Sequence, residues 1–261
     1  MDYLSPIRSE LKQKIILKLK EGEKKLAELK SGIDGRETSI LHVLKEFENL
    51  NLTTKNSGAY SLTSLGIIEA QIFQDIVSTA EVIEKFKEFW LNHDIKPIPP
   101  QLISRLGALK ESVLVHTEKT QLGQVYINFM QILMTSKKVS GISPIFHPDY
   151  VPMIENLLSQ GNNVDLVITS EVLNKTLSTA HLDELKKNFV EGTLKIFLNE
   201  DLRFALTVTD KNFSLGLFTL DGDYDDNMDL ISTSPQAIQW GEELFQIKLK
   251  ESTRIGPEVL S

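Results

Sequence analysis

The sequence predicts an α+β unit at the N-terminal end and a larger α/β unit behind it, joined by a long helix. Three observations support this division. Three short helical patterns and a hairpin signal fill the first sixty-odd residues, a long apolar periodicity without proline follows, and the remainder alternates between strand-like and helix-like segments. We place the parts at residues 1–66, 67–100 and 101–261, because 261 residues exceed what one small module needs.

Three short helices are predicted before residue 50. The first begins near Pro6 and stops at Gly22, with apolar residues at helical spacing in between: Ile7, Leu11, Ile15, Ile16 and Leu19. The second covers residues 24–31, where Ser31-Gly32 ends it. The third is expected to have Asp34 as its N-cap with Glu37 three residues later, an arrangement that satisfies free backbone N–H groups.

The third helix divides into two faces. Its packing side is predicted to hold Ile40, Leu41, Leu44 and Phe47, and its outer side Thr38, Ser39, His42 and Lys45. A helix that reads DNA needs this division, because one face packs on its own domain while polar and cationic side chains meet base edges and phosphates. A solvated amphipathic helix without a partner is the alternative interpretation.

A β-hairpin is predicted directly after the third helix. Residues 50–54 form the first strand, Asn56-Ser57-Gly58 forms a turn that can adopt positive φ, and residues 59–62 form the return strand. Three helices followed by a hairpin are the order of a winged helix-turn-helix, so double-stranded DNA is the first partner to consider.

The net charge of −8 is compatible with DNA contact at one end of the chain only. Residues 1–60 hold 11 Lys/Arg against 9 Asp/Glu, whereas residues 61–261 hold 17 against 27, and phosphate repels an acidic excess. The predicted DNA contacts therefore lie on the third helix and in the hairpin: Arg36, Thr38, Ser39, His42, Lys45 and Lys55.

One long helix is predicted from Leu65 to Trp90. Apolar residues recur there every three or four positions: Ile68, Ile72, Ile76, Ala80, Ile83 and Phe86. A second set widens this stripe beyond what one neighbour covers: Phe73, Val77, Val82 and Phe89. We therefore expect a helix of ~40 Å that packs on the second unit and on a second copy of the chain, as a homodimer. Packing within one chain is the alternative, and the proline-rich residues 96–100 end the segment.

The C-terminal part predicts an α/β sandwich with a mixed sheet. Strands are expected at residues 112–116, 138–145, 164–169, 194–198, 204–209, 214–220 and 228–232. Helices are expected at residues 102–109, 121–134, 150–159, 170–177, 182–189 and 235–251. Alternating strands and helices followed by a meander are typical of this class.

Such sheets bind ligands beyond the carboxyl ends of their strands. His147 and Thr169 follow predicted strands, so they are candidate contacts for an effector, either a small molecule or a protein. Tyr224 and Trp240 are further candidates, with a place in the core as the alternative for each.

The residues that several kinds of site require are absent from the sequence. There is no cysteine, which excludes disulfides, thiolate zinc sites and cysteine catalysis, and no glycine-rich nucleotide loop is present. The acidic run from Asp221 to Asp229 does not follow the EF-hand pattern, so neither a metal nor another cofactor is expected. No leader pattern or run of ~18 apolar residues occurs, and we expect a cytoplasmic protein that makes no membrane contact.

Parts of the sequence resemble a known family. The run from Ser39 to Leu52 resembles the recognition helix of archaeal winged-helix regulators, and Tyr60-Ser61-Leu62-Thr63-Ser64-Leu65-Gly66 resembles the exit of their wing. Residues 220–225, 229–232 and 237–245, the last including Trp-Gly-Glu-Glu-Leu-Phe, resemble the signature of methanogen-type regulators of the filament-regulator and methyltransferase-regulator kind. This resemblance implies a second domain similar in fold to phospholipase D-like domains.

The resemblance does not extend to phospholipase D chemistry. That chemistry needs His-x-Lys-x4-Asp, and the nearest candidate, His147-Pro148-Asp149, has aspartate in place of lysine. The other four histidines do not begin the motif: His42, His93, His116 and His181. We therefore expect a regulator that is not an enzyme, with a protein-interaction adaptor and a phosphodiesterase as the alternatives.

Overall fold

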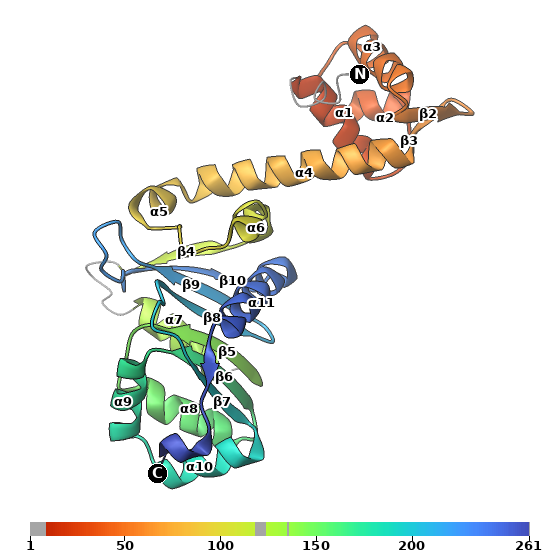
Figure 1. Ribbon diagram of the computed structural model, residues 1–261. Helices are drawn as coiled ribbons and strands as arrows, with labels where there is room; N and C mark the ends of the chain where they lie inside the picture. Colours follow the sequence, from red (N-terminus) through yellow and green to blue (C-terminus); the bar gives the residue numbers. More distant parts are fainter. Residues whose placement is uncertain (1–8, 118–123, 135, 261) are drawn as a thin grey trace. The chain divides into compact units, whose positions relative to one another are not determined.

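The computed structural model describes residues 9–117, 124–134 and 136–260 (Figure 1). The chain divides into two compact units between Ala80 and Glu81. This division lies inside a helix, whereas the sequence predicts boundaries after residues 66 and 100. The predicted linker is thus shared between the two units, because its first half packs in one core and its last turns in the other.

The first unit contains three helices and a three-stranded antiparallel sheet of order β1-β3-β2. Its elements are α1 (Glu10–Lys20), β1 (Lys24–Lys25), α2 (Leu26–Gly32), α3 (Glu37–Asn49), β2 (Thr53–Asn56) and β3 (Ala59–Leu62). The predicted helix over residues 24–31 begins two residues too early, because Lys24 and Lys25 pair with Tyr60 and Ala59 of β3. Pro6 and Ile7 of the first predicted helix lie outside the described residues.

The β2–β3 hairpin has a two-residue turn. Asn56 pairs with Ala59, and Ser57 and Gly58 between them have φ of 51° and 84°. Positive φ at both positions matches the right-handed twist of the strands. The predicted first strand began too early, because the chain turns at Asn51, with φ of 58°, so that the amide of Leu52 can donate to the Phe47 carbonyl at 2.8 Å.

Helix α3 starts later than predicted. Arg36, not Asp34, occupies the N-cap position, and no side chain caps the helix there. Ile33 is buried, and the chain stays non-helical from Ile33 to Arg36. Asp34 is consequently too far from the first turn to cap it, and Glu37 accepts from Lys30 at 2.8 Å instead.

The buried face of α3 differs from the prediction at one residue. Ile40, Val43, Leu44 and Phe47 are buried, a spacing of three, four and seven residues from the first. Leu41 was predicted to pack but is exposed, because it lies outside this arc, beyond Leu44, whereas Val43 lies at the opposite edge of the arc and is buried.

The predicted long helix is two helices, α4 (Ser64–Lys85) and α5 (Lys87–Asn92). Thr63 caps α4 by accepting from the Gly66 amide at 3.1 Å. Phe86 leaves the helical conformation, with φ of −115° and ψ of 30°, and its side chain enters the core of the second unit together with Phe89. At 1.5 Å per residue, α4 spans roughly 33 Å, shorter than predicted.

The second unit is built on an eight-stranded mixed sheet of order β11-β7-β6-β5-β8-β9-β10-β4. Strands β5, β6 and β7 run parallel and the remaining pairs are antiparallel. The strands are β4 (Val113–His116), β5 (Lys138–Ser143), β6 (Asn163–Ile168), β7 (Leu194–Leu198), β8 (Phe204–Thr209), β9 (Phe213–Leu217), β10 (Met228–Ser232) and β11 (Thr253–Arg254). The predicted mixed sheet is confirmed, and β11 is the strand that was not predicted.

Helices cover both faces of this sheet (Figure 1). They are α6 (Pro100–Ile103), α7 (Gln124–Met134), α8 (Tyr150–Ser159), α9 (Ser170–Thr179), α10 (Leu182–Glu191) and α11 (Pro235–Lys250), with 3₁₀ helices at Leu106–Leu109 and Pro257–Leu260. One core joins α5, α6 and α11 to one face, and a second core joins α8, α9 and α10 to the other. In the part of the chain that the structure describes, we find no helix long and apolar enough to cross a membrane.

Candidate functional site

The outer face of α3 carries several exposed side chains. Thr38, Leu41, His42 and Lys45 are exposed, whereas Ser39 is half-buried. Three of the predicted DNA contacts also line a hollow of about 420 Å³ between α1 and α3: Thr38, Ser39 and His42. The structure therefore brings these three together, while Arg36 lies at the helix start and Lys55 in the hairpin.

Most lysines of the first unit form ion pairs within it. Lys12 pairs with Glu46 at 2.5 Å and Lys30 with Glu37 at 2.8 Å, and Lys14, Lys18 and Lys24 likewise have acidic partners. Within the described ranges, neither Arg36 nor Lys45 forms an ion pair, and both are exposed. The predicted DNA-facing cations are thus charges that the unit does not neutralise itself.

Lys55 is held at the base of the hairpin turn. Its ammonium lies 4.9 Å from the centre of the Tyr60 ring, and the hydrogen bond with the Tyr60 phenol raises the pKa of Lys55. Tyr60 is itself buried in the core of the unit. The cation is therefore oriented by a fixed aromatic ring and remains exposed.

Helix α4 presents an apolar stripe to solvent. Ile68, Ile72 and Ile76 are 59%, 54% and 45% exposed, and Leu65 continues the stripe toward the start of the helix. The opposite face, with Ala70 and Phe73, is buried in the first unit. Exposed apolar residues at successive spacings of three, four and four, from Leu65 to Ile76, form a seam of the kind that a second helix covers.

Two of the four candidate effector contacts have structural roles in the second unit. Thr169 caps α9 by accepting from the Val172 amide at 3.2 Å. Trp240 is fully buried, and its indole N–H donates to the Leu102 carbonyl at 3.0 Å. Thr169 thus serves as a helix cap, and the Trp240 indole N–H has its partner within the protein.

The other two candidates differ in exposure. Tyr224 packs over β9, where a Cβ added at Gly216 would lie 2.3 Å from the phenol oxygen, so glycine is required there. Burial, followed by the Asp229 carboxyl, raises the pKa of Tyr224 well above its usual value. His147 has a side chain 44% exposed and stacks on Tyr150 with ring centres 5.3 Å apart. Its assignment as an effector contact remains a prediction.

The signature string Trp-Gly-Glu-Glu-Leu-Phe divides into a buried and a surface part. Gly241 allows α11 to approach the sheet, because an added Cβ would lie 2.6 Å from Phe213. Glu242 pairs with Lys138 at 3.3 Å, and Glu243 pairs with Arg105 at 2.5 Å. Residues of this string thus pack α11 against the sheet on one side and hold it by ion pairs on the other.

A buried pair joins α5 to the acidic loop after β9. The His93 ring is buried, with Nδ1 2.7 Å from the Phe89 carbonyl oxygen and Nε2 3.1 Å from Asp225 Oδ2. The backbone adds to this connection, because the Asp94 amide donates to the Phe218 carbonyl at 2.9 Å. Sequence reasoning missed this pair, since no local pattern links residues so far apart along the chain.

Asp229 is a second group that the sequence did not single out as buried. It lies in β10, and the Ser214 hydroxyl donates to its Oδ2 at 2.5 Å. Burial raises the pKa of Asp229 to about 7, although the Ser214 hydroxyl and the Leu230 amide act in the opposite direction. A carboxyl group held between strands thus changes charge near neutral pH.

The raised pKa of Asp229 predicts a pH-dependent stability. Well below pH 3.8 the Asp229 carboxyl is protonated in both the folded and the unfolded state. As pH rises from 3.8 to about 7, the unfolded state ionises first and the free energy of unfolding falls. The total loss is about 4 kcal/mol at 1.36 kcal/mol per pH unit. Asp229→Asn should therefore be more stable than wild type at pH 8 and lack this fall, measured by urea unfolding between pH 4 and 8.

The control for this prediction is Asp223→Asn, which changes an exposed aspartate of the neighbouring loop. It should follow the wild-type pH dependence. Parallel curves for wild type and Asp229→Asn would contradict the assignment of the raised pKa to Asp229.

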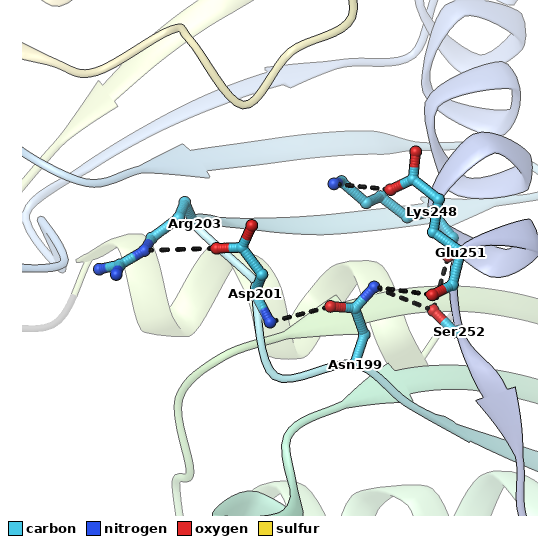
Figure 2. A network of polar contacts seen from close by, with 6 residues as sticks. All are labelled: Asn199, Asp201, Arg203, Lys248, Glu251 and Ser252. Atoms are coloured by element: carbon cyan, nitrogen blue, oxygen red, sulfur yellow. Dashed lines mark hydrogen bonds and ion pairs between the residues drawn. The ribbon is translucent and has the colours of Figure 1, made fainter.

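Polar contacts within the protein occupy the carboxyl end of β7. Asn199 donates from Nδ2 to the Glu251 carbonyl and the Ser252 hydroxyl, each at 3.4 Å, and its Oδ1 accepts from the Asp201 amide at 2.9 Å (Figure 2). Lys248 pairs with Glu251 at 2.9 Å in the same network. These contacts tie the loop after β7 to the end of α11.

A larger cavity lies at the opposite end of the parallel strands. It has about 760 Å³ and is lined by the start of β5, the end of β8 and the first half of α11, including Lys138, Thr209, Gln239, Glu242 and Glu243. A volume of this size falls in the range of small-molecule sites. His147, Thr169, Tyr224 and Trp240 are not among its lining residues.

Comparisons with known families match both units. Residues 5–81 match the N-terminal domain of "Methanogenesis regulatory protein FilR1", and residues 124–250 match the middle domain of the same protein family. The methanogenesis regulatory protein FilR1 of Methanothrix harundinacea (strain 6Ac) is 33% identical over 254 residues, which cover 95% of this chain. The chain spans 56% of the length of that relative.

Two solved structures are similar at low sequence identity. The archaeal chromatin protein TrmBL2 has a TM-score of 0.46 and 12% identity, over 94% of this chain and 93% of that one. Nuc of Salmonella typhimurium, a phospholipase D family member, has a TM-score of 0.42 and 8% identity, over 56% of this chain and 97% of that one.

A helical unit with a hairpin and a mixed-sheet unit, each matching a domain of one regulatory protein, define an archaeal regulatory protein. The chain belongs to the family of the methanogenesis regulatory protein FilR1. This family is named for regulation, in agreement with the expectation that the chain is not an enzyme.

Proposed function

We propose that this protein is a DNA-binding transcriptional regulator whose first unit is a winged helix-turn-helix. Helix α3 would enter the major groove of double-stranded DNA, and the β2–β3 hairpin would be the wing. Three helices followed by a two-residue hairpin turn support this assignment. The regulatory name of the family supports it as well.

The unpaired cations Arg36 and Lys45 carry this proposal. Acidic partners neutralise five other lysines of the unit, while these two charges remain exposed at the start and on the outer face of α3. Phosphate contacts by such charges supply the sequence-independent part of DNA affinity. Thr38, Ser39 and His42 would add polar contacts, and Lys55 would reach phosphate from the wing.

We also propose that the protein acts as a homodimer through the exposed stripe of α4. The stripe contains Ile68, Ile72 and Ile76 with Leu65, and its residue spacing is that of a helix–helix seam. A second copy offers the same apolar stripe, which makes the contact self-complementary. Helix-turn-helix proteins bind paired half-sites as dimers, so this occupant also fits the proposed activity.

The second unit would be the regulatory part. An effector, either a metabolite or a protein partner, would alter the spacing of the two recognition helices, provided that it binds the two arrangements with different affinity. The cavity beside α11 and the exposed His147 are the places where we expect such an effector.

The double variant Arg36→Ala, Lys45→Ala tests the DNA-binding surface. Its affinity for a promoter duplex that the wild-type protein binds should fall by about 100-fold, because each lost contact costs on the order of 1 kcal/mol or more of binding free energy. The dependence of log affinity on log salt should become shallower by about 0.9 for each lost phosphate contact. Fluorescence anisotropy at several salt concentrations measures both quantities.

Lys20→Ala is the matched control, since Lys20 is an exposed lysine at the end of α1. It should leave affinity and salt dependence close to those of wild type. Unchanged binding by the double variant would show that the assigned DNA face is wrong, and binding to a protein but to no DNA would favour an adaptor.

A further inference from the structure

Leu41 is an apolar side chain on the outer face of α3. It is 38% exposed, whereas the apolar residues of the buried face are 5% exposed or less: Ile40, Val43, Leu44 and Phe47. Its neighbours on the outer face, Thr38 and Lys45, are three residues before it and four residues after it. Residues at these spacings lie one above another along a helix, so a surface that meets Thr38 and Lys45 also meets Leu41.

An apolar side chain has one main counterpart among the base edges of the major groove. Guanine, cytosine and adenine present hydrogen-bonding groups there, whereas thymine also presents its C5-methyl group. Contact between this methyl group and a leucine removes apolar surface of both from water. Leu41 offers more apolar surface for this contact than Thr38, whose side chain carries a single methyl group beside its hydroxyl.

We infer that Leu41 contacts the C5-methyl group of a thymine in the operator and thereby selects an A·T pair at that position. The inference rests on the proposed function and deepens it by assigning one side chain to one base. It gives Leu41 a role in sequence specificity, while Arg36 and Lys45 contribute mainly to affinity.

Uracil substitution tests this contact, because uracil pairs like thymine but lacks the methyl group. The full-length protein first selects its preferred sequences from a random duplex library, and each thymine of the selected site is then replaced by uracil. In each half-site, one replacement should weaken wild-type binding about fourfold, the change expected for one methyl-sized group. The same replacement should leave binding by Leu41→Ala unchanged.

Alanine retains high helix propensity, so Leu41→Ala should keep α3 intact. Leu182→Ala is the matched control, because Leu182 on α10 has the same exposed fraction of 38%; it should retain the wild-type response to uracil. Duplexes in which no uracil matters, or equal sensitivity in Leu41→Ala, would overturn the inference while DNA binding stands. Failure of the wild-type protein to select any sequence would overturn the proposed function and this inference together.

Discussion

Replacing Ile72 and Ile76 by glutamate is expected to dissociate the proposed homodimer and to weaken binding to a two-half-site duplex by about 100-fold or more. Both side chains lie on the exposed stripe of α4, with exposed fractions of 54% and 45%. In a dimer the variant would place four carboxylates at one apolar seam, where like charges and lost burial both oppose association. Sedimentation velocity at micromolar concentration should then show a monomer.

Ile67→Glu is the matched control for this prediction. Ile67 is an isoleucine of the same helix with an exposed fraction of 55%, but it lies roughly 140° around the helix from Ile72. It should sediment as the wild-type dimer. A wild-type protein that sediments as a monomer, or a double variant that remains dimeric, would contradict the assignment of the stripe.

The substitution Trp240→Ala is expected to destabilise the second unit by about 3–5 kcal/mol, the usual cost of removing a large aromatic side chain from a core. Trp240 is fully buried, and its ring meets the Phe213 ring edge-on with ring centres 5.9 Å apart. Its indole N–H donates to the Leu102 carbonyl. Trp240→Phe should cost less, about 1–3 kcal/mol, since it keeps a ring but leaves that carbonyl without its donor. Urea unfolding followed by circular dichroism measures both.

Gln239→Ala provides the comparison, because Gln239 is the exposed neighbour of Trp240 on α11. It should change the unfolding free energy by less than about 0.5 kcal/mol. If Trp240→Ala unfolds at the wild-type midpoint but loses response to an effector, Trp240 would be a ligand contact and not a core residue.

The second unit was the more predictable part of the fold. Helix α8 and strands β7, β8 and β10 begin and end at the predicted residues, because each is a strongly periodic segment between clear breaks. The two-residue strand β1 is too short to show any period. The break at Phe86 was not predictable either, because Phe86 and Phe89 continue the helical spacing of apolar residues. Only their packing in the core of the second unit interrupts the helix.

The candidate site was predictable where it depends on local sequence. The outer positions of α3 follow from helix geometry, but Leu41 and Val43 differ by two positions and both are apolar, so only packing decides which is buried. The His93–Asp225 pair and the burial of Asp229 arise from contacts between distant parts of the chain. No spacing rule gives such contacts from one sequence.

The number of residues in α4 determines which side chains share a face of this helix. Phe73 belongs to the core of the first unit and Val82 to that of the second, and α4 continues between them without a loop. Each inserted residue would turn one end about 100° relative to the other, whereas seven residues would restore the phase to within about 20°. An insertion of seven residues within α4 should therefore keep Ile68, Ile72 and Ile76 on one face of the helix, whereas an insertion of two or three residues between them would divide this apolar stripe between two faces.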